Sequence, residues 1–269
     1  MKKLLFALSL GTLSVLSANA QILLSGGLSY SQNFDTALPS TGTSGVWTDN
    51  TTPLPGWYAA RATTGQAYTV FRIDNGANNS GSIFDYGATG GGDRALGSVA
   101  SGTPGTNAIG LLFKNDTGST WTGDISISYT GEQWRNGGNT STQTILYFSY
   151  FVTSTDISAG PIGALYPDPN YTALASLDFI SPTVGATAAA LDGDNPANQA
   201  ALSGTLFGIT LNANDYIMLR WSDINDAGND HGGGIDNLNV NFITVPEPTA
   251  AVLGGFALLG LGYWWRKRK

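Results

Sequence analysis

The stretch Ile125-Ser126-Ile127-Ser128-Tyr129-Thr130 alternates apolar residues with residues that carry a hydroxyl group. Successive side chains of a β-strand point to opposite faces of the sheet, so this pattern places Ile125, Ile127 and Tyr129 on one face. A strand of this kind covers a core with one face and meets solvent with the other. The stretch therefore predicts a half-buried strand, and it favours β-structure for the chain around it.

Comparable segments recur on both sides of this strand. Two of them, residues 206–211 and 216–221, are separated by Asn212-Ala213-Asn214-Asp215, which predicts a hairpin connection. The one helix-tolerant region, residues 186–202, is interrupted by Asp192-Gly193-Asp194-Asn195-Pro196. Spacing and turn signals predict roughly eight to ten strands and no long helix. The further expected strands are residues 68–73, 109–113, 145–152 and 238–242. We therefore expect an all-β, jelly-roll-like two-sheet sandwich.

The part of the chain that lies between its two ends is strongly acidic. Six of the 12 basic residues and all but one of the 19 acidic residues lie within residues 21–245, which gives that part a net charge of −12. A nucleic-acid backbone would be repelled by such a surface, so no nucleic-acid partner is expected. The chain has no cysteine and one histidine, which excludes a Cys/His zinc site. Acidic groups on an exported domain suit calcium or high solubility.

The N-terminus has the layout of a secretory signal peptide. Met1-Lys2-Lys3 is followed by an apolar run over residues 4–16 and by the small residues of Ser17-Ala18-Asn19-Ala20. The pattern predicts cleavage by a signal peptidase after residue 20. A short N-terminal anchor helix is the alternative, although the apolar run is short for a span.

The C-terminus carries three consecutive signals. Val245, Pro246, Glu247 and Pro248 precede an apolar stretch over residues 249–265 and a basic tail over residues 266–269. At ~1.5 Å per residue the apolar stretch would form a helix of ~25 Å, just long enough to cross a bilayer, with the basic tail left in the cytoplasm. An ordinary tail anchor is one explanation of this pattern.

In this order the three signals resemble the PEP-CTERM sorting signal of Gram-negative bacteria that make exopolysaccharide. The resemblance implies processing near Pro246-Glu247-Pro248 by an exosortase-type membrane protease. The chain would then be transiently membrane-anchored before it reaches the cell surface or the extracellular matrix. We accordingly expect a signal peptide over residues 1–20, an extracytoplasmic β-sandwich over residues 21–243 and a sorting signal over residues 244–269.

The middle of the chain also resembles a recurrent domain of secreted bacterial proteins. That likeness, which runs from about residue 30 to residue 243, implies an exported β-sandwich and carries no activity. Asn33-Phe34-Asp35 and Ile235-Asp236-Asn237-Leu238 look like the first and last strands of lectin-like jelly rolls, in which the chain ends pair side by side. The segments that carry the resemblance to the secreted bacterial domain are residues 54–61, 93–98, 129–135, 219–223, 230–232 and 235–238.

The densest polar cluster spans residues 223–231. Calcium takes six to eight oxygen ligands at flexible spacing, and carboxylates with backbone carbonyls supply them. We therefore consider a calcium site at Asp223, Asp226, Asp230 and Asp236. The EF-hand pattern is absent, because no glutamate closes the loop. A solvated loop whose side chains cap turns is the competing interpretation.

Catalytic residues are scarce. His231 could act as a general base beside Asp230, but no Gly-x-Ser-x-Gly elbow accompanies it, and a lone histidine in such a loop more often bonds to backbone. Glu132 could pair with an aspartate as in a glycosidase. The competing interpretation is a buried or edge carboxylate paired with an arginine.

Aromatic and basic side chains offer a second kind of site. Trp57, Trp134 and Arg135 are candidate ligand-binding residues, because aromatic faces stack on sugars and planar cations bond to hydroxyls. The structural alternative pairs the arginines with aspartates and aromatic rings inside the sandwich. It fits Arg220 best, since that residue lies in an apolar strand.

The patterns together favour a non-catalytic surface or exopolysaccharide-matrix protein that binds carbohydrate or calcium. An exported hydrolase acting on polysaccharide is the alternative, and it would require Glu132 and an aspartate to face one open groove ~5–10 Å apart.

Overall fold

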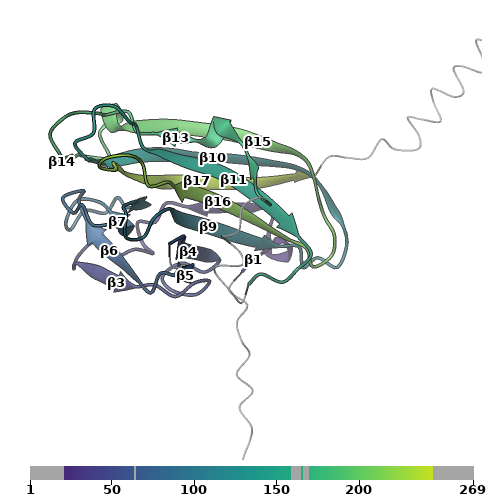
Figure 1. The fold of residues 1–269 in the computed structure, drawn as a ribbon. Coiled ribbons are helices and arrows are strands. Elements are labelled where there is room, and N and C mark those ends of the chain that lie inside the picture. The colour runs from purple at the N-terminus through teal and green to yellow at the C-terminus, as the bar shows by residue number, and fades with distance from the viewer. Residues whose placement is uncertain (1–20, 64, 159–164, 166–169, 245–269) are drawn as a thin grey trace, which may run out of the picture.

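The computed structural model describes residues 21–63, 65–158, 165 and 170–244. In this part the chain forms two β-sheets that lie face to face (Figure 1). The all-β sandwich expected from the sequence is thereby confirmed. The predicted signal peptide and sorting signal lie outside the described residues. Within them, no helix is both long and apolar enough to cross a membrane.

The first sheet has the strand order β12-β11-β16-β9-β4-β5, with β1 added on β9 and β13 added on β11. Its long strands are antiparallel, and β16 lies between β9 and β11. The strands of this sheet are β1 (Ile22–Leu23), β4 (Trp57–Arg61), β5 (Gln66–Ala67), β9 (Asn107–Lys114), β11 (Ile145–Thr153), β12 (Thr172–Ala173), β13 (Phe179–Ile180) and β16 (Tyr216–Asp223).

The second sheet has the order β14-β10-β17-β8-β7-β6-β3, with β15 added on β10 and β2 added on β17. Its strands are β2 (Ser29–Gln32), β3 (Ser44–Val46), β6 (Val70–Asp74), β7 (Ser82–Tyr86), β8 (Ala95–Val99), β10 (Trp121–Asn136), β14 (Ala189–Ala190), β15 (Gln199–Leu211) and β17 (Gly232–Thr244). Short 3₁₀ turns occupy η1 (Leu24–Gly26), η2 (Ala175–Leu177) and η3 (Pro196–Asn198).

The alternating stretch that predicted the fold lies in the middle of β10. Ile125, Ile127 and Tyr129 are buried in the core between the sheets, while Ser126 and Ser128 lie on the opposite face. Burial of one apolar face is the main stabilising contribution that such a strand makes.

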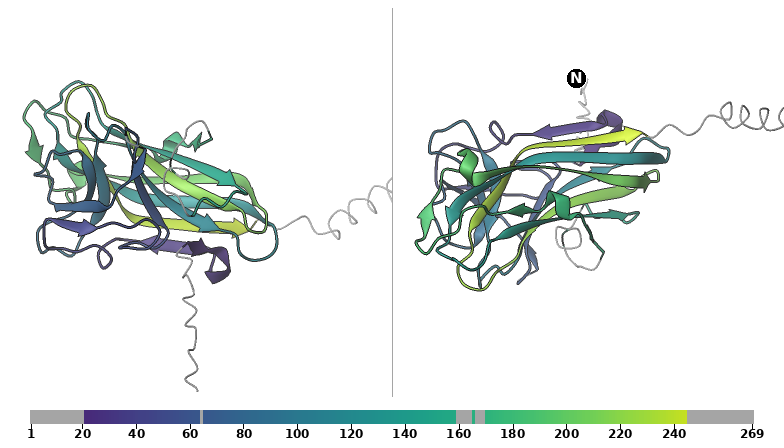
Figure 2. Two further views of the ribbon diagram at one scale, coloured as in Figure 1. Left: turned by 60° about the horizontal axis from the view of Figure 1, so that its bottom comes forward. Right: turned by 90° about the horizontal axis from the view of Figure 1, so that it is seen from above.

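The predicted side-by-side pairing of an early strand with the last strand is confirmed, but Asn33-Phe34-Asp35, expected in that early strand, follow it. β2 runs antiparallel to β17, with Gln32 opposite Leu238 and Tyr30 opposite Val240. In the view from above in Figure 2, β2 (purple) lies alongside the end of β17 (yellow). This pairing brings the loop that follows β2 to the first half of β17.

The predicted hairpin at residues 212–215 is wrong. β15 pairs with β10 in the second sheet, whereas β16 pairs with β9 and β11 in the first. The connection is still a tight turn, closed by the backbone N–H of Asn212 donating to the Asp215 carboxylate at 2.8 Å. Both strands carry apolar faces that each sheet can bury, so the turn carries the chain across the core.

Candidate metal centre and polar pocket

Three carboxylates from distant parts of the chain converge at one point. Asp35 follows β2, Asp93 lies in the loop between β7 and β8, and Asp236 is on β17. One oxygen from each of the three lies within 4.8 Å of the others. The sequence pattern pointed to Asp236 as a calcium ligand, but not to Asp35 or Asp93.

The fold holds these carboxylates through neighbouring contacts. The backbone N–H of Arg94 donates to Asp35 Oδ1 at 3.0 Å. Arg94 is fixed in turn, since its Nε donates to the buried Asp85 carboxylate at 2.6 Å. On β17 the register against β10 shifts next to Asp236, and Asn237 adopts a positive φ of 52°. This irregularity turns the local backbone where the strand passes the cluster.

Burial and mutual repulsion dominate the electrostatics of the cluster. Burial, and to a smaller extent the charges of Asp93, Asp35 and Asp194, raise the pKa of Asp236 to about 7. The pKa of Asp194 rises to about 6 through burial and through Asp93 and Asp192. A group of carboxylates that oppose one another's ionisation is stabilised by a bound cation.

One atom of this cluster points to a ligand independently. Asp236 is 1% exposed, and its Oδ1 is buried without a hydrogen-bond partner in the described structure. Its Oδ2 accepts a hydrogen bond from the Asn237 side chain at 2.5 Å. A buried carboxylate oxygen without a donor is costly, and a hard cation with oxygen ligands would satisfy it. The donor set is all oxygen, as calcium requires.

The four aspartates proposed from the sequence do not form one site. Asp223 is 1% exposed, and its Oδ2 accepts a hydrogen bond from Ser98 at 2.6 Å. Asp230 Oδ1 accepts from the backbone N–H of Asp226 at 2.8 Å. The charges of Asp230 and Asp226 contribute to the raised pKa of Asp223, whereas those that contribute at Asp236 belong to Asp93, Asp35 and Asp194. Calcium binding stays a prediction, but the structure changes the residues that would hold the ion.

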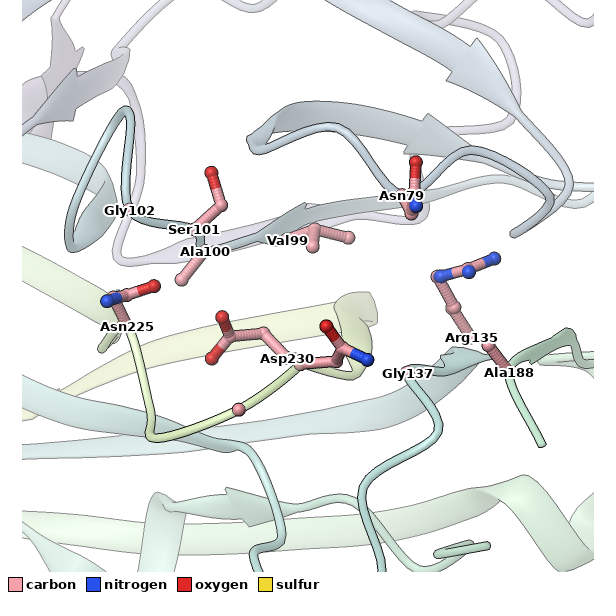
Figure 3. A pocket seen from close by; sticks show the side chains of 12 residues that line it. Asn79, Val99, Ala100, Ser101, Gly102, Arg135, Gly137, Ala188, Asn225 and Asp230 are labelled. Atoms are coloured by element: carbon pink, nitrogen blue, oxygen red, sulfur yellow. The ribbon is translucent and has the colours of Figure 1, made fainter. Parts of the chain in front are cut away.

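The loop around Asp230 borders a polar pocket of about 280 Å³ instead. Figure 3 shows Asn79 and Ser101 on one wall, with Asn225 and Asp230 opposite and Arg135 at one end. Its amide, hydroxyl and carboxylate groups are the kinds that bond to sugar hydroxyls. Burial raises the pKa of Asp230 to about 6.

The two tryptophans predicted to bind ligand lie inside the protein. Trp57 is fully buried between the sheets and stacks on Trp221, with ring centroids 6.0 Å apart. Trp134 is 2% exposed, stacks on Tyr86 at 6.0 Å and donates from Nε1 to Glu132 at 3.0 Å. Neither ring offers a face on which a sugar could stack in this conformation. Both contribute to the packing of the sandwich.

Arg135 is the third predicted ligand-binding residue, and it borders the polar pocket. It is 8% exposed, and its Nη1 donates to the carbonyl oxygens of Gly76 and Ala77, both at 3.0 Å. Its Nε is buried without a partner in the described structure. Arg135 therefore holds the loop at Gly76 and Ala77 and also borders the polar pocket.

The candidate catalytic groups are both enclosed. Glu132 is 2% exposed and also accepts a hydrogen bond from Gln199 Nε2 at 3.1 Å, while burial raises its pKa to about 8. His231 is fully buried, and its Nδ1 accepts from the backbone N–H of Gly137 at 3.0 Å. Glu132 does not border the polar pocket. The open groove that a glycosidase pair would require is not found at Glu132.

Comparison with known proteins gives no family assignment. No family model matches the chain, and no curated protein matches it. Among solved structures, the K3 cleaved adhesin domain of Lys-gingipain from Porphyromonas gingivalis is 12% identical, with 79% of this chain and 97% of that chain covered and a TM-score of 0.38. The CBM22-1 xylan-binding domain of Xyn10C from Paenibacillus barcinonensis is 13% identical, with 81% and 95% covered and a TM-score of 0.33. At these values the likeness assigns neither a ligand nor an activity to this chain.

Proposed function

We propose that this chain is an exported, non-catalytic protein of the cell surface or exopolysaccharide matrix, built on a jelly-roll-like sandwich that binds calcium. The observation that carries the proposal is the convergence of Asp35, Asp93 and Asp236, together with the unpartnered buried oxygen of Asp236. An ion at this point would tie the loop after β2 and the loop before β8 to the last strand. Such a link would hold the N-terminal and C-terminal parts of the sandwich together outside the cell.

Calcium suits this cluster better than magnesium. Calcium accepts irregular arrangements of oxygen ligands, whereas magnesium demands near-ideal octahedral geometry and keeps several waters. Two of the three carboxylates come from loops, and both oxygens of Asp35 already accept hydrogen bonds, from Asn33 and from Arg94. The ligand set is therefore irregular, and some of its oxygens already accept hydrogen bonds from the protein. Such a set is compatible with the flexible coordination of calcium.

Isothermal titration calorimetry of the full chain in detergent micelles, after removal of metal with EDTA, tests the calcium site. We expect one calcium site with much weaker binding of magnesium. Asp93→Asn and Asp236→Asn should each weaken calcium binding by at least about tenfold, since each removes a charged ligand. Asp116→Asn is the matched control, because it removes the same charge at a site remote from the cluster. Equal loss in all three variants would show a general charge effect and refute the site.

The export part of the proposal rests on the two chain ends. A signal peptidase would remove residues 1–20, and an exosortase-type protease would act near Pro246, Glu247 and Pro248. Expression in a host that has an exosortase, followed by mass spectrometry of the mature chain, tests this. We expect the Glu247→Ala variant to keep its C-terminal segment and to stay in the membrane fraction. Identical processing of both chains would refute the sorting role.

Carbohydrate is the ligand class that the pocket at Asp230 suits, because amides, a hydroxyl and a carboxylate face one another there. A glycan array probed with the full chain tests this, with Asn79→Ala and Asn225→Ala as pocket variants and Asn239→Ala as an exposed control. We expect the signal to fall in the pocket variants alone. No observation favours the hydrolase, since Glu132 is enclosed by Trp134 and Gln199.

A further inference from the structure

Basic side chains are scarce in the described part of the chain, so their partners are informative. Four of them have a clear role in the fold. Arg94 binds Asp85, Arg135 binds two carbonyl oxygens, and Arg220 donates to Ser149 Oγ at 3.1 Å and to the Leu165 carbonyl at 2.9 Å. Lys114 lies over the ring of Tyr216, 5.2 Å from its centroid.

The two remaining cations, Arg61 and Arg72, border the same pocket. It has a volume of about 360 Å³ and lies where the edges of the two sheets meet. Arg61 ends β4 in the first sheet, and Arg72 is in β6 of the second. The strands β3, β4, β5 and β6 gather in the lower part of Figure 1. Two arginines are thus brought together by tertiary structure.

Neither guanidinium has a hydrogen bond or salt bridge in the described structure, and the Nε of Arg61 is buried without a partner. Arg61 lies over the ring of Tyr68, 5.2 Å from its centroid, and that ring is held by the Tyr68 hydroxyl donating to Asn107 at 2.6 Å. The cation is therefore positioned by an aromatic platform, while its donors remain available. Two unpaired guanidiniums in one pocket repel each other, and an oxyanion between them would remove that cost.

The rest of the lining suits a sugar. The side chains of Ser44, Thr69 and Ser82 add neutral hydroxyls around the two cations. Such groups bond to sugar hydroxyls, while the planar fork of arginine matches a carboxylate in two parallel bonds. The strongly acidic surface disfavours a densely charged polyanion, because all its charges beyond the pocket would be repelled. A glycan with a single carboxylate on each sugar unit meets less of this repulsion.

We propose that the pocket between Arg61 and Arg72 binds the carboxylate of an acidic sugar unit in a glycan chain. This inference rests on the proposed role at the surface or in the matrix, and it names the class of polysaccharide that the protein would contact. It does not depend on the calcium site, because none of the lining residues of this pocket belongs to the carboxylate cluster.

Calorimetry with the full chain in detergent micelles, in the presence of EDTA, tests the proposal without the metal. The probe is trigalacturonate, and the matched neutral probe is the same trisaccharide with its carboxyl groups reduced to alcohols. We expect the acidic trisaccharide to bind at least about tenfold more tightly, because charged hydrogen bonds are lost with the neutral one. Arg61→Gln and Arg72→Gln should each weaken binding by about tenfold or more. Lys114→Gln removes the same charge elsewhere and should change little.

Arg72→Lys keeps the charge without the planar fork, and we expect binding between those of the parent chain and Arg72→Gln. Thermal unfolding of each variant shows whether it is folded, and the two Arg72 variants carry the test if Arg61→Gln is not. Equal affinity for the two trisaccharides would overturn the proposal. So would an equal loss in Lys114→Gln, or binding of triglutamate as tight as that of trigalacturonate. Because EDTA is present throughout, failure here leaves the calcium proposal standing, and failure of the calcium titration leaves this one standing.

Discussion

The two acid-rich regions of the sandwich differ in where their carboxylates come from. Asp223, Asp226 and Asp230 are close in sequence, and Ser98 and the Asp226 backbone N–H donate to one oxygen each of Asp223 and Asp230. Asp223 Oδ1, like Asp236 Oδ1, is buried without a partner in the described structure. Asp35, Asp93 and Asp236 are far apart in sequence, and their oxygens face one another. The acidic cluster at residues 223–230, which is conspicuous in the sequence, is thus a loop held by local hydrogen bonds. The cluster of Asp35, Asp93 and Asp236 is formed by pairing between distant strands.

The difference also concerns what neutralises each group. Asp223 is 1% exposed, and burial, with a smaller contribution from the charges of Asp230 and Asp226, raises its pKa to about 8, so a proton can neutralise it at neutral pH. If protons neutralised all three carboxylates of the cluster at Asp35, Asp93 and Asp236, these groups could no longer act as charged ligands. A divalent cation is the more effective counter-charge for the second region.

The largest expected effect is the response of stability to calcium. At a free calcium concentration about a thousand times the Kd, binding to the folded state alone would add about 4 kcal/mol to the free energy of unfolding. Urea titrations with calcium and with EDTA measure this difference. We expect Asp236→Asn to reduce this difference by at least about 1.4 kcal/mol, the equivalent of tenfold weaker binding, and Asp230→Asn to preserve it. The reverse pattern would restore the loop as the calcium site and remove the distinction between the two regions.

The second effect is a pH dependence that belongs to the loop region. The pKa of Asp223 is about 8 in the folded protein against an ordinary value of 3.8, so the folded state holds this proton more tightly than the unfolded state does. Its contribution is therefore most favourable below pH 4 and declines as the pH rises towards 8, by at most about 1.4 kcal/mol per pH unit.

Asp223→Asn should remove this decline, because the amide keeps the shape and carries no charge. Urea titrations of both chains between pH 5 and pH 9, with EDTA present, would show a flatter curve for the variant. Parallel curves would mean that Asp223 is ionised at neutral pH and that the loop needs a cation after all.

The strands were predictable because their signal is local. The alternation in residues 125–130 and the apolar runs at 109–113 and 145–152 each fall within a strand of the structure. The turn at residues 212–215 was also recognisable, but its flanking strands belong to different sheets. Nothing in a turn of four residues reveals whether it folds back within one sheet or crosses to the other, since both sheets bury apolar faces.

The site was less predictable because it depends on pairing between distant strands. Asp35 and Asp236 lie in segments that the sequence predicts to be neighbours, yet Asp93 joins them only through the placement of β8 beside β17. The burial of the two tryptophans was unpredictable for a different reason. An indole ring suits a sugar platform and a core equally well, and only the packing against Trp221 or Tyr86 distinguishes the two.

The smallest effect concerns His231 at the end of the acidic loop. Burial lowers its pKa below 6.5, and the acceptor Nδ1 that binds the Gly137 N–H would be lost on protonation. The folded state binds this proton less tightly than the unfolded state, so its contribution is intact above pH 6.5 and is lost as the pH falls below the folded pKa.

The cost of that protonation should be about 1 kcal/mol, the scale of one buried hydrogen bond. Urea titrations of the parent chain and of His231→Gln at pH 5 and pH 7.5 measure it. Asp223, Glu132 and Asp236 have raised pKa values and act in the opposite direction in both chains, so the difference between the chains reports His231. We expect the change in stability on acidification to be about 1 kcal/mol less favourable in the parent. An equal change in both chains would place the acid-sensitive group elsewhere, and the loop would then be held by its aspartates and not by its histidine.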